Sequence, residues 1–198
     1  MGNIQRYTAY HATDKHNVES IISNNFTFNK SDEHWLGNGI YFFIDVALAR
    51  EWGKKAPTKK FGTIENYAII EAIIEVDDDY VCDLTMLDDY KFVAQKFSEF
   101  CAILSSRSVV LENASYLNLR CAFFNELVRK YNFKCLISNF EDRKNFIDKN
   151  LWKTFRKIKT VYIETQICVT DNSCIVSKKQ YTEILKGLKY EEKRNNCI

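Results

Sequence analysis

The run from Val161 to Thr170 constrains the fold more than any other part of this chain, because its residues alternate as they do in a β-strand. One face would carry Val161, Ile163, Thr165, Ile167 and Val169, and the other would carry Tyr162, Glu164, Gln166, Cys168 and Thr170. We expect the first face to lie in the core. The second sets Glu164 and Gln166 about 6.5–7 Å apart along the strand. A solvated outer face would show the same pattern, so this strand alone assigns no role.

Strand-like and helix-like segments follow one another along the 198 residues without a regular strand–helix–strand repeat. This order predicts an α+β protein rather than a doubly wound parallel sheet, built as one domain over residues 1–198. The expected strands cover 5–11, 39–44, 67–76, 80–84, 133–138 and 160–170. The expected helices cover 17–24, 46–52, 87–104, 115–131 and 178–189, with a surface loop over 54–62.

Composition excludes several classes of protein. The net charge of +2 implies no partner by itself, and the seven cysteines form no CxxC pair. Cysteines within apolar stretches are typical of buried free thiols, so we expect no metal centre. The N-terminus has no apolar signal region, and no run of about 18 apolar residues occurs. We therefore expect a soluble, cytoplasmic protein that does not contact membranes.

Two short motifs near the N-terminus carry the chemistry. They read Tyr10-His11-Ala12-Thr13 and Trp35-Leu36-Gly37-Asn38-Gly39-Ile40-Tyr41-Phe42. A lone histidine or a tyrosine among apolar residues is most often structural. Two glycines directly before Tyr41, however, permit positive φ or a close backbone approach, as ligand-binding loops often need. Trp35 and Trp52 bracket the second motif and supply an aromatic wall. We expect His11, Tyr41 and the polar edge of the 160–170 strand to meet in one cleft.

These motifs resemble the first two signatures of the H-Y-E ADP-ribosyltransferases, the relatives of diphtheria toxin and the poly(ADP-ribose) polymerases. The stretch from Gln166 to Ile175 resembles the third signature, which runs from the catalytic residue toward an Asp, here Asp171, and a terminal Ile. The resemblance covers roughly residues 7–53 and 160–176. It implies an ADP-ribosyltransferase-like fold, in which two small, mostly antiparallel sheets form an NAD cleft flanked by helices.

The resemblance also implies roles for single residues. His11 would hydrogen-bond the adenosine-side ribose of NAD, and the backbone of Ala12, followed by Thr13, would hold the nicotinamide carboxamide. Tyr41, preceded by Gly39, would stack on the nicotinamide ring. The chain places Trp52 eleven residues after Tyr41, at the position of the family's second stacking aromatic. The expected cofactor-binding set is His11, Ala12, Thr13, Gly39, Tyr41 and Trp52, with NAD as a substrate and no metal.

The chain departs from the family pattern at three places. Ala12 replaces the usual glycine, and Ala47 and Ala49 stand where a serine often contacts the carboxamide. The catalytic position holds Gln166 instead of glutamate, with Glu164 two residues upstream. A carboxylate about 4 Å from an oxocarbenium-like ribose would stabilise it by roughly 4 kcal/mol at an effective dielectric near 20, which an amide does not match. We expect the catalytic set Gln166, Glu164, His11 and Tyr41, with Glu164 supplying the charge.

The acceptor is the most open part of the prediction. Residues 143–159 carry seven Lys or Arg against one Asp, interleaved with aromatic residues, and four more lysines lie within 54–60. This pattern favours an RNA or DNA acceptor slightly over protein, although an amphipathic helix with a solvated basic face explains it as well. The resemblance fits a mono-ADP-ribosylating toxin or effector held by an inhibitory partner protein. Two alternatives stay open: an NAD or ADP-ribose binding module, and a basic nucleic-acid-binding protein.

Overall fold

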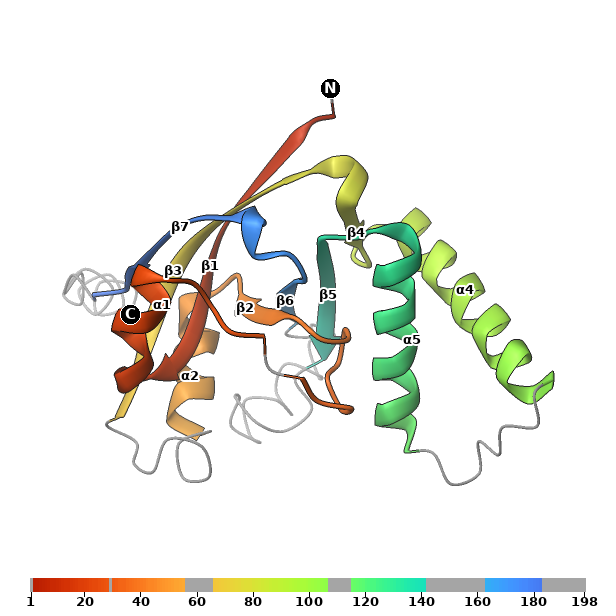
Figure 1. The fold of residues 1–198 in the computed structure, drawn as a ribbon, viewed down its shortest axis with the longest axis horizontal. Coiled ribbons are helices and arrows are strands. Elements are labelled where there is room, and N and C mark those ends of the chain that lie inside the picture. Colours follow the sequence, from red (N-terminus) through yellow and green to blue (C-terminus); the bar gives the residue numbers. More distant parts are fainter. Residues whose placement is uncertain (1, 29, 56–65, 107–114, 142–162, 183–198) are drawn as a thin grey trace, which may run out of the picture.

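The computed structural model describes residues 2–28, 30–55, 66–106, 115–141 and 163–182 (Figure 1). The described strands form one mixed seven-stranded sheet in the order β4-β5-β6-β2-β1-β3-β7. The neighbours pair antiparallel, except that β4 and β5 run parallel. The strands are β1 (Ile4–Asp14), β2 (Ile40–Phe43), β3 (Tyr67–Asp77), β4 (Val81–Asp83), β5 (Cys135–Glu141), β6 (Ile163–Val169) and β7 (Ile175–Gln180), and the helices are α1 (Val18–Ser23), α2 (Val46–Lys55), α4 (Leu87–Ser106) and α5 (Tyr116–Tyr131).

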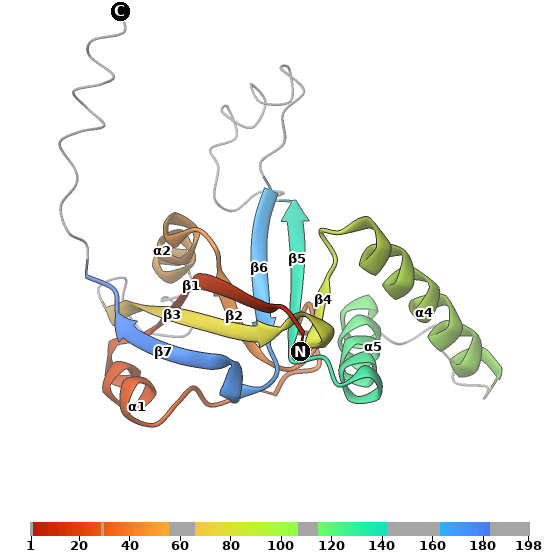
Figure 2. The ribbon, with the colours of Figure 1, turned by 90° about the horizontal axis from the view of Figure 1, so that it is seen from above.

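The α+β class is confirmed, but the expectation of two separate sheets is wrong. A single register pair, Tyr10 with Phe43, joins β1 to β2, whereas β1 and β3 pair along their whole length. Figure 2 shows the consequence: β1, β3 and β7 cross the direction of β5 and β6, so the sheet has two differently oriented halves. Backbone hydrogen bonding through that one pair makes the halves one sheet.

Both sides of the sheet are covered, because apolar residues occur at successive positions in the central strands. On one side Ile40, Phe42, Ile70, Ile167 and Val169 pack with Val18 and Ile21 of α1. On the other side, α5 packs against the β5–β6 half, α4 lies beyond it against α5 and β4, and α2 covers the β1–β3 half (Figure 1). Burial of apolar side chains on both faces is the main source of stability for a sheet that is covered on both sides.

The expected division of the 160–170 strand into a core face and a polar face needs correction at one residue of each face. Cys168 is fully buried and Ile163, expected in the core, is half exposed. The reason is position along the strand: the end of β6 near Val169 lies deep between β5 and β2, while Ile163 lies at the opposite end. Residues 160–162 lie outside the described residues.

The helix expected over 178–189 is wrong where the structure describes it. Residues 178–180 belong to β7, which pairs antiparallel with β3 through Lys178 opposite Ala72 and Lys179 opposite Glu71. Edge pairing with a long strand thus overrides the local preference of a lysine-rich stretch. The expected loop over 54–62 also begins too early, because Lys54 and Lys55 lie in α2. The rest of that loop and residues 183–189 lie outside the described residues.

Candidate functional site

Strand register brings three of the predicted site residues to one face of the sheet. Tyr41 of β2 lies opposite Cys168 of β6, and the next pair on that face is Phe43 opposite Gln166. Glu164 precedes Gln166 by two residues along β6 and therefore points to the same side. Directly opposed residues in such a pair have Cβ atoms about 4.5–5.5 Å apart, and diagonal neighbours remain within reach of long side chains. Tyr41, Gln166 and Glu164 thus form one polar stripe, which we call the β2–β6 stripe.

The phenol of Tyr41 is held firmly by the turn that precedes it. Its hydroxyl accepts a hydrogen bond from the Leu36 amide at 2.7 Å and donates one to the Gly37 carbonyl, also at 2.7 Å. Burial, with a smaller contribution from Cys168, raises the pKa of Tyr41 well above its ordinary value. The hydroxyl therefore stays protonated at neutral pH and does not serve as a base. The group of Tyr41 that a ligand could contact is its rigidly placed ring, whose centroid lies 5.5 Å from that of the His34 ring.

The two motif glycines have structural explanations. Gly37 has φ +79°, and a Cβ there would lie 2.7 Å from Asn125 Oδ1. That same oxygen accepts the Asn38 amide at 2.7 Å, which ties the turn to α5. A Cβ on Gly39 would lie 2.5 Å from Cys168 Sγ and 2.8 Å from the Val169 carbonyl. Packing on β6 thus requires glycine at residue 39, and the predicted cofactor role of Gly39 has no separate support.

His11 is fixed on the other face of the sheet from the Tyr41 ring. Its Nδ1 lies 2.7 Å from the Tyr41 carbonyl, and its ring packs against Phe26 and Phe42 with centroids 5.1 and 5.7 Å away. A carbonyl only accepts, so Nδ1 carries the proton and Nε2 is the acceptor of the neutral ring. His11 therefore contacts the backbone of β2 and not the β2–β6 stripe. The expectation that His11, Tyr41 and the polar edge of the 160–170 strand share one cleft is wrong for His11.

Glu164 and Gln166 contact each other directly. The Gln166 amide Nε2 donates a hydrogen bond to the Glu164 carboxylate Oε1, so one residue orients the other. Glu164 is only 5% exposed, which is rare for a carboxylate and marks it as different from a solvated outer-face residue. Gln166 is partly buried. The β2–β6 stripe therefore holds a sequestered carboxylate next to a neutral amide.

Helix α2 brings the second predicted aromatic residue close to this stripe. Trp52 is partly buried and packs into the cluster of Phe43, Ala49 and Ile69, and Phe43 is the residue opposite Gln166. The Ala12 side chain shares the α2 face of β1, while Thr13 alternates to the other face; they are 3% and 5% exposed and pair with Ile69 and Ala68 of β3. Ala49 of α2 is fully buried, so its methyl group contributes to core packing.

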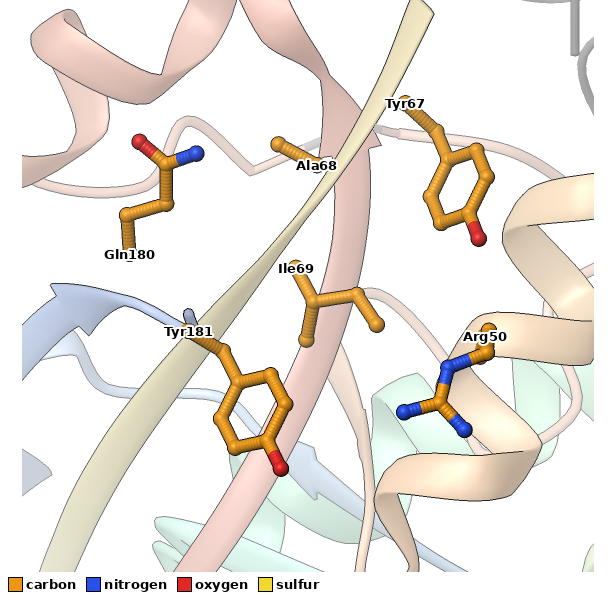
Figure 3. A pocket seen from close by; sticks show the side chains of 6 residues that line it. All are labelled: Arg50, Tyr67, Ala68, Ile69, Gln180 and Tyr181. Carbon is orange, nitrogen blue, oxygen red and sulfur yellow. The ribbon is translucent and has the colours of Figure 1, made fainter. Parts of the chain in front are cut away.

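A hollow of about 190 Å³ lies beside α2, against the β3–β7 edge of the sheet (Figure 3). In Figure 3 Ile69 lies between Arg50 on one side and Tyr181 on the other. Tyr67, Ala68 and Gln180 also line this hollow. Tyr67 also closes over Gly53, where a Cβ would lie 2.5 Å from the ring, so this hollow is bounded by tightly packed aromatic residues. None of the predicted site residues lines it.

The structure adds residues that sequence reasoning missed. Arg120 of α5 has its guanidinium 4.9 Å from the Trp35 ring centroid, and Trp35 packs edge-on against Phe140 at 4.7 Å. Phe140 of β5 lies opposite Glu164 in the register. The sequence contains a signal for Arg120. It lies four residues before Phe124 and seven before Leu127, so it shares a helix face with apolar residues, where a charged side chain is unusual. The basic segment 143–159 lies outside the described residues.

The described part of the chain contains no group of three or more His, Cys, Asp or Glu side chains arranged to hold a metal ion. Among the described helices, none combines the length and apolar character that crossing a bilayer requires. Burial raises the pKa of the Cys168 thiol to about 12, so it stays protonated next to Tyr41. Among the described residues, the β2–β6 stripe presents a carboxylate from Glu164, an amide from Gln166 and the ring of Tyr41.

No protein-family model matches the chain. The chain is 26% identical over 204 residues to the uncharacterized protein MJ0359 of Methanocaldococcus jannaschii, an alignment covering 92% of this chain and 90% of that protein. The similarity thus extends over nearly the full length of both chains, and it carries no activity with it.

Proposed function

We propose that this protein is an NAD-dependent mono-ADP-ribosyltransferase that modifies a macromolecule. The observation that carries the proposal is the β2–β6 stripe: the ring of Tyr41, the Gln166 amide and the buried Glu164 carboxylate share one face. Trp52 packs against Phe43 beside this stripe. Two aromatic residues near a sequestered carboxylate suit a planar, cationic pyridinium ring and the ribose attached to it.

The proposed reaction breaks the bond between the ribose C1′ and the nicotinamide nitrogen. The bonding electrons leave with nicotinamide, the acceptor's nucleophilic atom attacks C1′, and that atom loses its proton to solvent or to a nearby base. Positive charge develops on the ribose between these events. Glu164 would stabilise it by roughly 4 kcal/mol if its carboxylate comes within about 4 Å. Gln166, which hydrogen-bonds that carboxylate, would hold it in place.

A single transfer fits these residues better than chain elongation. Elongation needs a group that activates a ribose hydroxyl of the previous unit. The neutral Gln166 amide is not a base, and in this proposal the Glu164 carboxylate is engaged with the ribose cation. The Tyr41 hydroxyl is not one either, since it donates to the Gly37 carbonyl and its pKa is raised by burial. We therefore propose one ADP-ribose group per acceptor site, with nucleic acid favoured over protein and no metal required.

One observation favours a second function, an NAD or ADP-ribose binding module without turnover. Gln166 and Glu164 hydrogen-bond each other, which reduces what either side chain offers to a ribose. Such a module would keep the aromatic contacts of Tyr41 and Trp52 and lose the catalytic charge. The reading as a basic nucleic-acid-binding protein depends on residues 143–159, which the structure does not describe.

The functions are separated by one experiment with two readouts. The protein is incubated with NAD labelled on the adenine side, together with separate pools of RNA, DNA and protein, and free nicotinamide is quantified by chromatography. Transfer predicts nicotinamide release together with label on one pool. Label confined to protein overturns the nucleic-acid preference. Binding of NAD without nicotinamide in any pool contradicts the transferase and selects the binding module.

A further inference from the structure

A second set of contacts lies at the edge of the β2–β6 stripe, formed by Trp35, Arg120 and Phe140, which we call the Trp35 cluster. Trp35 is 49% exposed although it makes an edge-on contact with Phe140 and receives the Arg120 guanidinium on its ring. A tryptophan that is fixed by two neighbours and still half open to solvent offers a rigid stacking surface. Loop, helix and strand each contribute one of these side chains.

Arg120 is the unusual member of the Trp35 cluster. Its Nε and Nη2 atoms are buried and have no hydrogen-bond partner within the described ranges. Guanidinium donors almost always find an acceptor when they lose contact with water. The same guanidinium contacts an exposed aromatic ring, so a ligand that stacks on Trp35 would lie next to it. Phosphate is the acceptor whose geometry an arginine fork matches best.

The Trp35 cluster is placed to act together with the predicted chemistry. Phe140 lies opposite Glu164 in the β5–β6 register, and Trp35 directly precedes Leu36, whose amide binds the Tyr41 hydroxyl. Phe140 therefore lies between a group bound on Trp35 and the Glu164 carboxylate. An acceptor bound there would lie beside the position that we propose for the ribose.

We propose that the Trp35 cluster binds one nucleotide of a single-stranded nucleic-acid acceptor, with its base stacked on Trp35 and its phosphate held by Arg120. The proposal rests on the proposed transferase function and names its acceptor site. Asp32 and Glu33 lie in the same loop and disfavour a long phosphate track, so the cluster takes a single nucleotide unit. Stacking on an exposed aromatic ring beside a cation is how sequence-tolerant single-strand binding works.

The test measures binding without NAD, so that it does not depend on turnover. Fluorescein-labelled RNA and DNA hexanucleotides are titrated with the full chain, and anisotropy gives the dissociation constant. Trp35→Leu and Arg120→Gln are each expected to weaken binding about tenfold. Arg120→Gln is also expected to flatten the salt dependence by about 0.7, the contribution of one single-strand phosphate. The matched controls are Tyr90→Leu, an exposed aromatic on α4, and Arg129→Gln, an exposed arginine on α5.

Each outcome decides the proposal. Weaker binding in both cluster variants, with both controls unchanged and all chains giving the same circular dichroism spectrum, supports it. Equal loss in the controls shows a general charge effect and overturns it. If free ADP-ribose binds at the Trp35 cluster while the oligonucleotides bind elsewhere, the cluster is a site for the donor and the proposal is wrong.

Arg120→Met gives a second variant. It is expected to raise the melting temperature, because it removes the buried donors, and to lose oligonucleotide binding. Absence of nicotinamide release by the native chain, with intact oligonucleotide binding, would refute the transferase and not the binding site.

Discussion

Glu164 shows how much the surroundings of one residue change its meaning. Strand alternation places it on a polar face, and by composition alone that face would be solvated. In the structure the side chain is buried to 5% exposure and hydrogen-bonded by Gln166. A buried carboxylate is costly unless its partners or its function justify it, so Glu164 is the residue on which the proposed chemistry depends most.

We therefore expect Glu164→Gln to reduce nicotinamide release about 10²- to 10³-fold, because it removes the charge that stabilises the ribose cation. Glutamine keeps an oxygen that can accept the Gln166 amide, so the local hydrogen bond survives. Gln166→Ala is expected to cost the same or less. The control is Glu75→Gln, which removes a surface carboxylate paired with Arg6. An unchanged rate in the Glu164 variant would remove this carboxylate from the mechanism.

Tyr41 allows the roles of ring and hydroxyl to be separated. Tyr41→Phe keeps the ring but leaves the Leu36 amide and the Gly37 carbonyl without their 2.7 Å partner. We expect the free energy of unfolding to fall by about 1–3 kcal/mol, as measured by urea denaturation at neutral pH. A change below about 0.5 kcal/mol would show that the turn does not depend on the hydroxyl.

At the scale of elements, the turn before β2 connects the site to α5. Gly37 has positive φ, and its Cα faces the Asn125 side chain that binds the Asn38 amide. We expect Gly37→Ala to destabilise the protein by about 1–3 kcal/mol through backbone strain and the clash with Asn125 Oδ1. In the double variant Gly37→Ala/Asn125→Ala the clash disappears while strain and the lost amide contact remain. Equal stability of Gly37→Ala and the native chain in urea would contradict this account.

The elements also show what local sequence determines. The apolar alternation of residues 67–76 and the helical spacing of 87–104 and 115–131 predicted β3, α4 and α5 to within a few residues, because each carries its own periodic pattern. The β7 strand was missed because its pairing partner, β3, is about a hundred residues away in sequence. Likewise, the position of Glu164 opposite Phe140 follows from long-range register, and the contact of Arg120 with Trp35 follows from how α5 packs on the sheet.

At the scale of the whole molecule, buried thiols predict how stability depends on pH. Burial raises the pKa of Cys82 and Cys168 from 9.0 to about 12. In the unfolded chain these thiols lose their protons above pH 9, while in the folded chain they keep them up to about pH 12. Stability is therefore complete below pH 9 and falls by about 1.4 kcal/mol per pH unit for each thiol above it.

Urea unfolding under reducing conditions at pH 7.5, 9.5 and 10.5 checks this dependence. We expect the free energy of unfolding to decline from near pH 9. In Cys168→Ala the decline is expected to be smaller by about 1.4 kcal/mol per pH unit, the contribution of one thiol. The raised pKa of Tyr7 and of Tyr41 adds a further decline above pH 10. A free energy of unfolding that stays constant from pH 7.5 to 10.5 would contradict the assignment of protonated, buried thiols.

The whole account depends on NAD binding at the face that carries Tyr41, Trp52 and Glu164. The most direct measurement is calorimetric titration of the native chain with a non-hydrolysable NAD analogue. We expect one site per chain, lost in Trp52→Ala and kept in Tyr90→Ala, because the first removes an aromatic beside the β2–β6 stripe and the second an exposed aromatic on α4. No heat of binding, or equal binding in the Trp52 variant, would contradict the central claim.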